Sequence, residues 1–562
     1  MHQLEDVMQE LGVYWDVYVL ALLCSMWFLF RLKRRIELSR AKAPNLTGHV
    51  RWSRRMAKWI PGYSYDESRW FSVDGAPTVI RQRRQQALQN LGARMQAKTE
   101  KTLTLTHQAE PLISDLQFTR RYRVPYQFQE LFLKHVPITA FWDKSEGNQL
   151  FDADGNAYWD ATGSYGLNVF GTAFYQSCVD AGIAETKALG PVLGSYHPCV
   201  LENVERLCEI SQMDEVSFHM SGTEAVMQAV RLARYHTKRH KVVRFSGAYH
   251  GWWDDMQPGP GNPSEPAANT LTLREGHANT LHVLRTRTDI ACVLINPLQA
   301  MHANSAAPSD STLVLADRKA QYDRDAHTQW LQALRRVCTE RGVALIFDEV
   351  FMGFRLGKRG AQGYFGVVAD MVTYGKTLGG GLPVGVICGK KAWMQRYSER
   401  RPADICFARG TFNAHPYVMG AMREFLRRLD SQSIEGLYAN ASRVWSVRLA
   451  NANATLRAAN LPVYFVAMET VWTLVYSVPS RYNWMLQFYL REQGVALSWV
   501  GTGRFIFNLS YSDEEFEKLM QAVVRACERM REDGWWWTAH DANPKRIKFA
   551  LMRELIWHRV MG

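Results

Sequence analysis

The stretch MVTYGKTLGGGLPVG at residues 371–385 decides how the rest of the chain is interpreted. An apolar run typical of a buried strand stops at a single lysine, Lys376, and a glycine-rich turn that permits close backbone approach follows it. Lysines usually lie at the surface, where water solvates their charge. Because desolvation lowers the pKa of an amine and exposes it to carbonyl groups, the stretch indicates a nucleophilic lysine at the edge of a sheet.

Similar apolar runs recur from about residue 126 onward, separated by segments of helix length. Near-continuous apolar strands are typical of a mostly parallel sheet covered by helices on both faces, which predicts an α/β fold. Ligands bind such sheets beyond the carboxyl ends of the strands, so we expect the chemistry where the runs end. The runs are EVSFHM at 215–220, KVVRF at 241–245, DIACVLIN at 289–296, GVALIFDEV at 342–350, MVTYG at 371–375 and PVGVICG at 383–389.

Two further polar features stand at the ends of these runs. Ser221, Gly222 and Thr223 open a helical pattern, where free N–H groups and the helix dipole can hold a phosphate, although a plain helix cap uses the same residues. Asp348 closes the 342–350 run, and a buried carboxylate needs a cationic partner such as a protonated ring nitrogen or an ion-pair partner. Together with Lys376 these are the parts of a pyridoxal 5'-phosphate site, so this cofactor is predicted.

Longer motifs around these residues resemble the class III pyridoxal-phosphate aminotransferases of fold type I, and within them most closely glutamate-1-semialdehyde aminomutase. They occur in family order over roughly residues 126–530. The resemblance implies a large domain with a mostly parallel sheet and a smaller C-terminal α+β domain. The motifs are LFDADGNAYWDATGSYG at 150–166, VSFHMSGTEAVMQAVRLAR at 216–234, YHGWWDD at 249–255, LIFDEVFMGFR at 345–355, YGKTLGGGLPVG at 374–385 and GTFNAHP at 410–416.

The resemblance also implies a role for each matching residue. Lys376 corresponds to the Schiff-base lysine and proton shuttle, and Asp348 to the partner of the pyridine nitrogen. The remaining cofactor-binding positions are Ser221, Gly222 and Thr223 at the phosphate, and Tyr249 and Val350 on the two ring faces. Thr411 corresponds to a residue that reaches the phosphate of the neighbouring subunit, which implies a homodimer. No metal ligand set is expected.

The substrate side departs from the family pattern. Tyr165 corresponds to a residue that lines the substrate pocket. Where many relatives have Glu-Pro, this chain has Asn296-Pro297, and Gln299 follows nearby, so a carboxylate is lost from the expected substrate region. The following loop, 300–327, is long for the family, and loops of this length are often functional. These departures weaken the case for glutamate semialdehyde as substrate.

An apolar segment, VYVLALLCSMWFLF, occupies residues 17–30. Extended back to Val13 it contains 18 residues and one charge, Asp16, which is near the lower limit for crossing a bilayer. Arg31 and three further basic residues follow at once, which by the positive-inside rule keeps the catalytic part cytoplasmic. The segment therefore predicts a single-pass N-terminal transmembrane helix in contact with lipid, with a buried or interface-lying helix as the alternative.

Basic residues concentrate next to this segment. Residues 31–101 hold 17 Lys or Arg and five Asp or Glu. Beside an apolar segment, such a block fits anionic lipid headgroups better than nucleic acid, and no nucleic-acid partner is expected. The C-terminal stretch 545–562 also mixes basic and apolar residues, which fits either a membrane surface or packing against the protein.

The nine cysteines form no C-x-x-C pair, which favours reduced thiols over a disulfide framework.

The sequence divides into six expected parts. The parts are a membrane anchor at 1–36, a basic extension at 37–125, the N-terminal segment of the aminotransferase at 126–185, the large cofactor-binding domain at 186–420, the small domain at 421–535 and a basic amphipathic tail at 536–562.

We expect an aminotransferase that moves an amino group from an amino acid donor to a carbonyl acceptor. The anchor favours a hydrophobic acceptor, such as a long-chain or polyketide-like aldehyde or ketone. The nearest alternative is an intramolecular 2,1-aminomutase, and a less favoured one is condensation of an acyl thioester with an amino acid. A non-enzymatic membrane scaffold is disfavoured because Lys376, Asp348 and the phosphate-binding segment are all present.

Overall fold

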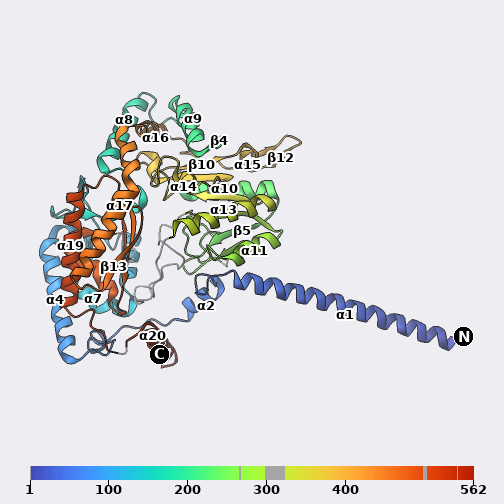
Figure 1. The fold of residues 1–562 in the computed structure, drawn as a ribbon, viewed down its shortest axis with the longest axis horizontal. Helices are drawn as coiled ribbons and strands as arrows, with labels where there is room; N and C mark the ends of the chain where they lie inside the picture. The colour runs from blue at the N-terminus through green and yellow to red at the C-terminus, as the bar shows by residue number, and fades with distance from the viewer. Residues whose placement is uncertain (1, 265–267, 298–322, 498–502, 541, 562) are drawn as a thin grey trace.

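A seven-stranded sheet forms the centre of the large domain in this computed structural model (Figure 1). The structure describes residues 2–264, 268–297, 323–497, 503–540 and 542–561, and side chains from residue 17 onward within them. In spatial order the strands are β4 (Glu215–His219), β10 (Gly385–Gly389), β9 (Met371–Gly375), β8 (Ala344–Asp348), β7 (Ile290–Ile295), β5 (Lys241–Phe245) and β6 (Thr270–Leu273).

The predicted α/β fold is confirmed, with one strand reversed. From β9 through β8, β7 and β5 to β6, neighbouring strands are parallel, whereas β10 is antiparallel to both β4 and β9. All six apolar runs form strands, and β7, β8, β9 and β10 are buried along their whole lengths. The carboxyl ends of β4, β8 and β9 therefore lie at the same edge, where the predicted site residues stand.

Helices cover both faces of this sheet. On one face α10 packs through Val226 and Val230 against residues such as Leu294 and Ile346. The opposite face packs against α11 and α13, whose Leu284 and Leu334 are buried with Val293 and Leu345. The large-domain helices are α8 (Thr172–Thr186), α9 (Cys199–Ser211), α10 (Gly222–Thr237), α11 (Ala278–Thr286), α13 (Arg324–Arg341), α14 (Gly360–Phe365), α15 (Lys391–Met394) and α16 (Pro416–Arg428).

The small domain is built on an antiparallel sheet. Strand β14 lies between β13 and β16, and Trp472 of β14 is buried against Phe507 and Phe516. A second sheet joins three N-terminal strands to β15. The elements are β1 (Lys144–Glu146), β2 (Gln149–Phe151), β3 (Ala157–Asp160), α17 (Gln432–Ala458), β13 (Val463–Met468), β14 (Val471–Tyr476), α18 (Leu486–Glu492), β15 (Val495–Ala496), β16 (Arg504–Ile506) and α19 (Asp513–Glu532).

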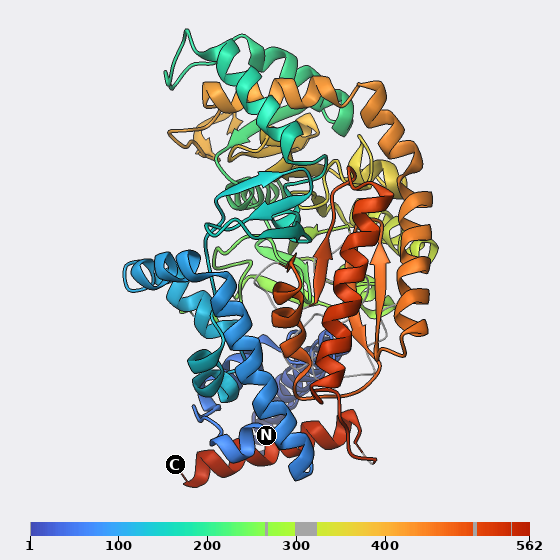
Figure 2. The same cartoon turned by 90° about the vertical axis from the view of Figure 1, so that its left-hand side faces the viewer.

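The N-terminal extension packs against the small domain (Figure 2). Helix α4 buries Leu88 and Leu91, and its Arg84 is fully buried, where it donates to the carbonyl of Gly534 and pairs with Asp74. The extension thus forms part of the folded body beside the small domain. Its helices are α2 (Val50–Trp59), α3 (Glu67–Trp70), α4 (Thr78–Lys98), α5 (Glu100–Ala109), α6 (Ser114–Tyr122) and α7 (Gln129–His135).

The apolar N-terminal segment lies within α1 (His2–Arg40), a long helix that projects from the body (Figure 1). No helix within the described residues combines the length and apolar character needed to cross a membrane, so the expected single-pass anchor is not supported. The described side chains begin at residue 17, so they include the run 17–30 but not its extension back to Val13.

Candidate active site

The phosphate-binding segment lies where β4 gives way to α10. Ser221 caps the helix, because its hydroxyl accepts the N–H of Glu224 at 3.3 Å. Gly222 is packed so closely that an added Cβ would lie 2.6 Å from Cγ1 of Val350, and a Cβ on Gly385 would lie 1.9 Å from the Ser221 carbonyl oxygen. The first N–H groups of a helix have no partner within it, so this crowded backbone forms a positively polarised cradle that fits a phosphate.

Asp348 ends β8 and is almost fully buried. Its Oδ1 accepts the N–H of Val350 at 3.1 Å and the hydroxyl of Thr373 at 3.3 Å, and its Oδ2 lies 2.6 Å from Nδ1 of His250. Burial lowers the pKa of His250, so a neutral imidazole donates from Nδ1 to the carboxylate. The carboxylate is thereby fixed in an orientation that suits a cationic partner.

Lys376 follows β9 directly and has a left-handed backbone, with φ of 45°. A lysine in this conformation is strained, and such strain persists where the surroundings enforce it, often at functional sites. Its Nζ donates to the carbonyl of Tyr165 at 2.6 Å and lies 5.0 Å from the centre of the Phe351 ring. Burial, together with the nearby Arg504 and Arg355, lowers the pKa of Lys376 to about 8, although Asp348 opposes the shift. A substantial fraction of this amine is therefore neutral near physiological pH.

Arginine side chains surround the lysine on the small-domain side. Arg504, which begins β16, is buried, and burial lowers its pKa to about 10, while the nearby phenol of Tyr165 opposes the shift. Arg355 is fully buried and donates to Thr470 at 2.7 Å and to the carbonyl of Asn168 at 3.1 Å. Burial also lowers the pKa of Arg123 to about 10, and Tyr165 opposes that shift as well. The Nε of Arg123 has no hydrogen-bond partner among the described residues. The site is therefore cationic and suited to an anionic substrate group.

The other predicted site residues differ in their burial and in their location. The side chain of Tyr249 is 61% exposed next to His250, and Asn296 is buried with its amide 3.3 Å from the backbone oxygen of Asp348. Thr411 lies on the wall of a broad groove that residues of β4 up to Phe218 also line. Gln299 and most of the 300–327 loop lie outside the described residues.

Sequence reasoning missed three members of the site: His250, Arg355 and Arg504. The first two stand inside the motifs YHGWWDD and LIFDEVFMGFR, but nothing in a motif shows that His250 meets a carboxylate 98 residues away. Arg504 stands alone at the start of a short strand in the small domain, 128 positions after Lys376. Its single sequence signal is a lone arginine that opens an apolar strand, and a buried charge in such a place needs an anionic partner.

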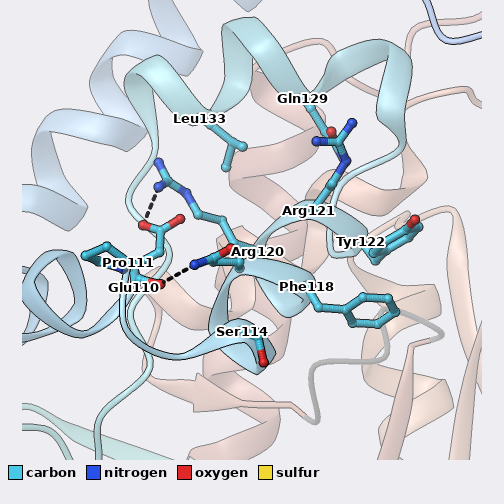
Figure 3. A pocket seen from close by; sticks show the side chains of 10 residues that line it. Glu110, Pro111, Ser114, Phe118, Arg120, Arg121, Tyr122, Gln129 and Leu133 are labelled. Atoms are coloured by element: carbon cyan, nitrogen blue, oxygen red, sulfur yellow. Dashed lines mark hydrogen bonds and ion pairs between the residues drawn. The ribbon is translucent and has the colours of Figure 1, made fainter.

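A separate open pocket lies between α5, α6 and α7 (Figure 3). Arg120 pairs with Glu110 at 2.5 Å there, and the rings of Phe118 and Tyr122 lie 4.4 Å apart between their centres. None of the predicted site residues lines this pocket. Arg123, the next residue after Tyr122, instead lines a small cavity with Arg491 and Leu497.

Comparison with known proteins decides the family. The model of the family described as Aminotransferase class-III matches residues 133–255 and 323–527, more than half of the chain. The chain belongs to the class III aminotransferases. Pyridoxal phosphate is therefore its cofactor, and the cradle, Asp348 and Lys376 are arranged to hold it.

Relatives of this aminotransferase include aminomutases and transaminases. The glutamate-1-semialdehyde 2,1-aminomutase 2 of Brevibacillus brevis is 30% identical over 421 residues, which cover 69% of this chain and 91% of the relative. A structure described as a transaminase with PLP bound has a TM-score of 0.63 at 25% identity and covers 78% of this chain and 99% of its own. A glutamate-1-semialdehyde aminomutase from Pseudomonas aeruginosa has the same TM-score at 19% identity, over 80% of this chain and 99% of its own, which supports the fold alone.

Proposed function

We propose that this enzyme transfers an amino group from an amino acid donor to a carbonyl acceptor. The observation that carries the proposal is the Lys376 amine, with its lowered pKa, held by the Tyr165 carbonyl on the same sheet edge as Asp348. Bound pyridoxal phosphate supplies an electron sink that makes the Cα–H bond of an amino acid acidic. The neutral fraction of this amine can then take up that proton.

Each residue has a task in this proposal. Nζ of Lys376 removes the Cα proton of the donor and, in the reverse half-reaction, returns a proton to the carbon of the acceptor. The carboxylate of Asp348, oriented by His250 and Thr373, supplies the negative charge that a protonated ring nitrogen needs. The Ser221–Thr223 backbone holds the phosphate through its N–H groups.

Arg504 is the proposed binding partner of the donor carboxylate, because it is a buried cation close enough to Lys376 to lower its pKa. We expect Arg504→Gln to raise the KM for amino acid donors about 10–100-fold, the loss of one charged hydrogen bond, and to spare amines without a carboxylate. Steady-state kinetics with matched donors measure the difference. The control is Arg525→Gln, which removes an exposed arginine from α19. An equal loss with both donor types contradicts this role for Arg504.

The acceptor proposed is hydrophobic, on the ground of the exposed apolar segment of α1. Feeding donors to the purified enzyme and following the bound cofactor by absorbance identifies the donor, and acceptors of increasing chain length then test the second half-reaction. We expect turnover to increase with chain length. Equal turnover on short polar aldehydes would remove the hydrophobic acceptor and leave the aminotransferase proposal standing.

The second candidate is an intramolecular aminomutase, which the names of several relatives favour. The replacement of the family's Glu-Pro by Asn296-Pro297 weighs against transferring their substrate to this chain. An aminomutase that starts with its cofactor in the amine form needs no external donor. Sustained turnover without a donor therefore distinguishes the two.

The proposed assembly is a homodimer. Thr411 and the exposed side chains of Phe407 and Tyr196 line a groove that a second copy can fill. Light scattering is expected to give twice the 64.4 kDa of one chain, whereas a purely monomeric, active enzyme contradicts the dimer.

A further inference from the structure

The C-terminal helix α20 (Pro544–Met561) is attached to the protein through polar contacts. Glu554 pairs with Arg481 at 2.8 Å and with Arg69 at 3.0 Å, and it accepts the hydroxyl of Tyr65 at 2.6 Å. His558, one turn further on, stacks on Tyr63 with ring centres 4.0 Å apart. Burial alone raises the pKa of Glu554, but Arg481, Tyr65 and Arg69 together outweigh burial and lower the pKa to about 2, so Glu554 is ionised at neutral pH.

The opposite face of α20 is apolar and exposed. Phe549, Met552, Ile556 and Val560 recur at the three- and four-residue spacing of one helix face, and their exposed fractions are 68, 59, 47 and 74%. This inverts the usual arrangement, in which a surface helix turns its apolar face toward the core. None of the described residues covers this apolar face, so it is available to an external surface.

All exposed charges on α20 are positive. The only acidic residue of the helix is Glu554, which faces the protein. The exposed cations flank the apolar stripe and are Lys545, Arg546, Lys548, Arg553 and Arg559. A second copy of the same helix would be repelled by these charges, whereas an anionic surface would attract them.

Two further helices present the same chemistry along the same edge of the molecule (Figures 1 and 2). Helix α2 has no acidic residue and exposes Trp52 beside the cations Arg51, Arg55 and Lys58. Helix α1 exposes large apolar side chains from Val17 to Ile36. Aromatic and aliphatic side chains mixed with lysine and arginine are typical of helices that lie in the interface of a bilayer.

We propose that α1, α2 and α20 form one docking face for an anionic lipid bilayer, with α20 embedded along its apolar stripe and its cations at the headgroups. Lipid provides both parts of the required surface, an apolar layer under a negative one. The Glu554 contacts then fix the orientation of the folded body relative to the bilayer. This inference is independent of the reaction proposed above.

A position-specific probe on the full-length holoenzyme tests the face. Cys24 is the one exposed cysteine within the described residues, so Cys24→Ser provides a background for labelling. In it, Phe549→Cys on α20 carries an environment-sensitive fluorophore. The matched control is Phe118→Cys, which is 54% exposed and lies on α6, in the pocket of Figure 3 and not on α1, α2 or α20. We expect a blue shift at position 549 with vesicles containing phosphatidylserine, but not with phosphatidylcholine alone, and no shift at position 118.

The second measurement uses a variant that keeps the native apolar stripe of α20 and changes only the cations beside it. Replacing Lys545, Lys548 and Arg553 together by glutamine is expected to weaken binding to the anionic vesicles about 100-fold in a flotation assay. Binding to vesicles with the probe at 549 still in water would overturn the three-helix face, because α1 alone would then carry the contact. A concentration-dependent shift without vesicles, which indicates a second copy, or no vesicle binding at all would overturn it equally.

Discussion

Lys376→Ala is expected to reduce turnover by at least about four orders of magnitude, because the substitution removes the amine that moves the proton. The fold should survive. Alanine and lysine both carry a Cβ, so the left-handed backbone at position 376 has the same strain in either case. Single-turnover kinetics give the rate, the visible absorbance of the bound cofactor reports the lost attachment, and circular dichroism reports the fold.

Two controls separate chemistry from structure. Lys134→Ala removes an exposed lysine that pairs with Glu130, and it should leave turnover unchanged. Small primary amines added to the Lys376→Ala enzyme should restore part of the rate, since they supply the missing base. In the unaltered protein, the pKa of about 8 predicts that cofactor capture by the apoprotein accelerates as the pH rises through that value. Normal turnover by Lys376→Ala would exclude the lysine from the reaction.

The central sheet could be predicted because its strands are buried on both faces. Six apolar runs therefore stood out from the helical segments, and each forms a strand. The short, threonine-rich β6 did not stand out, since it contributes only TLTL at the sheet edge. The reversed direction of β10 was also beyond prediction, because an apolar run carries no information about which way the chain crosses the sheet.

The candidate site was predictable wherever a residue type and a local motif coincide. Lys376 and Asp348 each end an apolar run, and a charged residue there requires an explanation. The contacts that tune them come from distant parts of the chain, as with His250 and Arg504. The buried Arg84 shows the same limit, because its partner, the Gly534 carbonyl, is 450 residues away. Helix α4, which carries Arg84, is rich in polar residues and nevertheless packs into the body.

Asp348→Asn is the second substitution with a large expected effect. Asparagine keeps the shape, its Oδ1 can still accept from Val350 and Thr373, and its Nδ2 can donate to Nδ1 of His250 once the imidazole carries its proton on Nε2, but the substitution removes the negative charge at the end of β8. A ring nitrogen then has no anion to keep it protonated, and we expect a fall of about a thousandfold in the rate, roughly 4 kcal/mol of transition-state free energy. The single-turnover rate with saturating cofactor measures this loss separately from weaker cofactor binding.

Stability should change in the opposite direction from activity. In the apoprotein the Asp348 carboxylate is buried and accepts three hydrogen bonds, but because burial lowers the pKa of His250, no described cation contacts it directly, and burying its charge costs stability. Asp348→Asn should therefore leave the apoprotein Tm unchanged or raise it. Asp370→Asn is the matched control, because Asp370 is equally enclosed but pairs with Arg335 at 2.8 Å and accepts the Leu345 N–H at 2.8 Å. That variant should lower the Tm and keep the intrinsic rate. If both variants lose stability alike, Asp348 is a structural carboxylate, and its assignment to the cofactor fails.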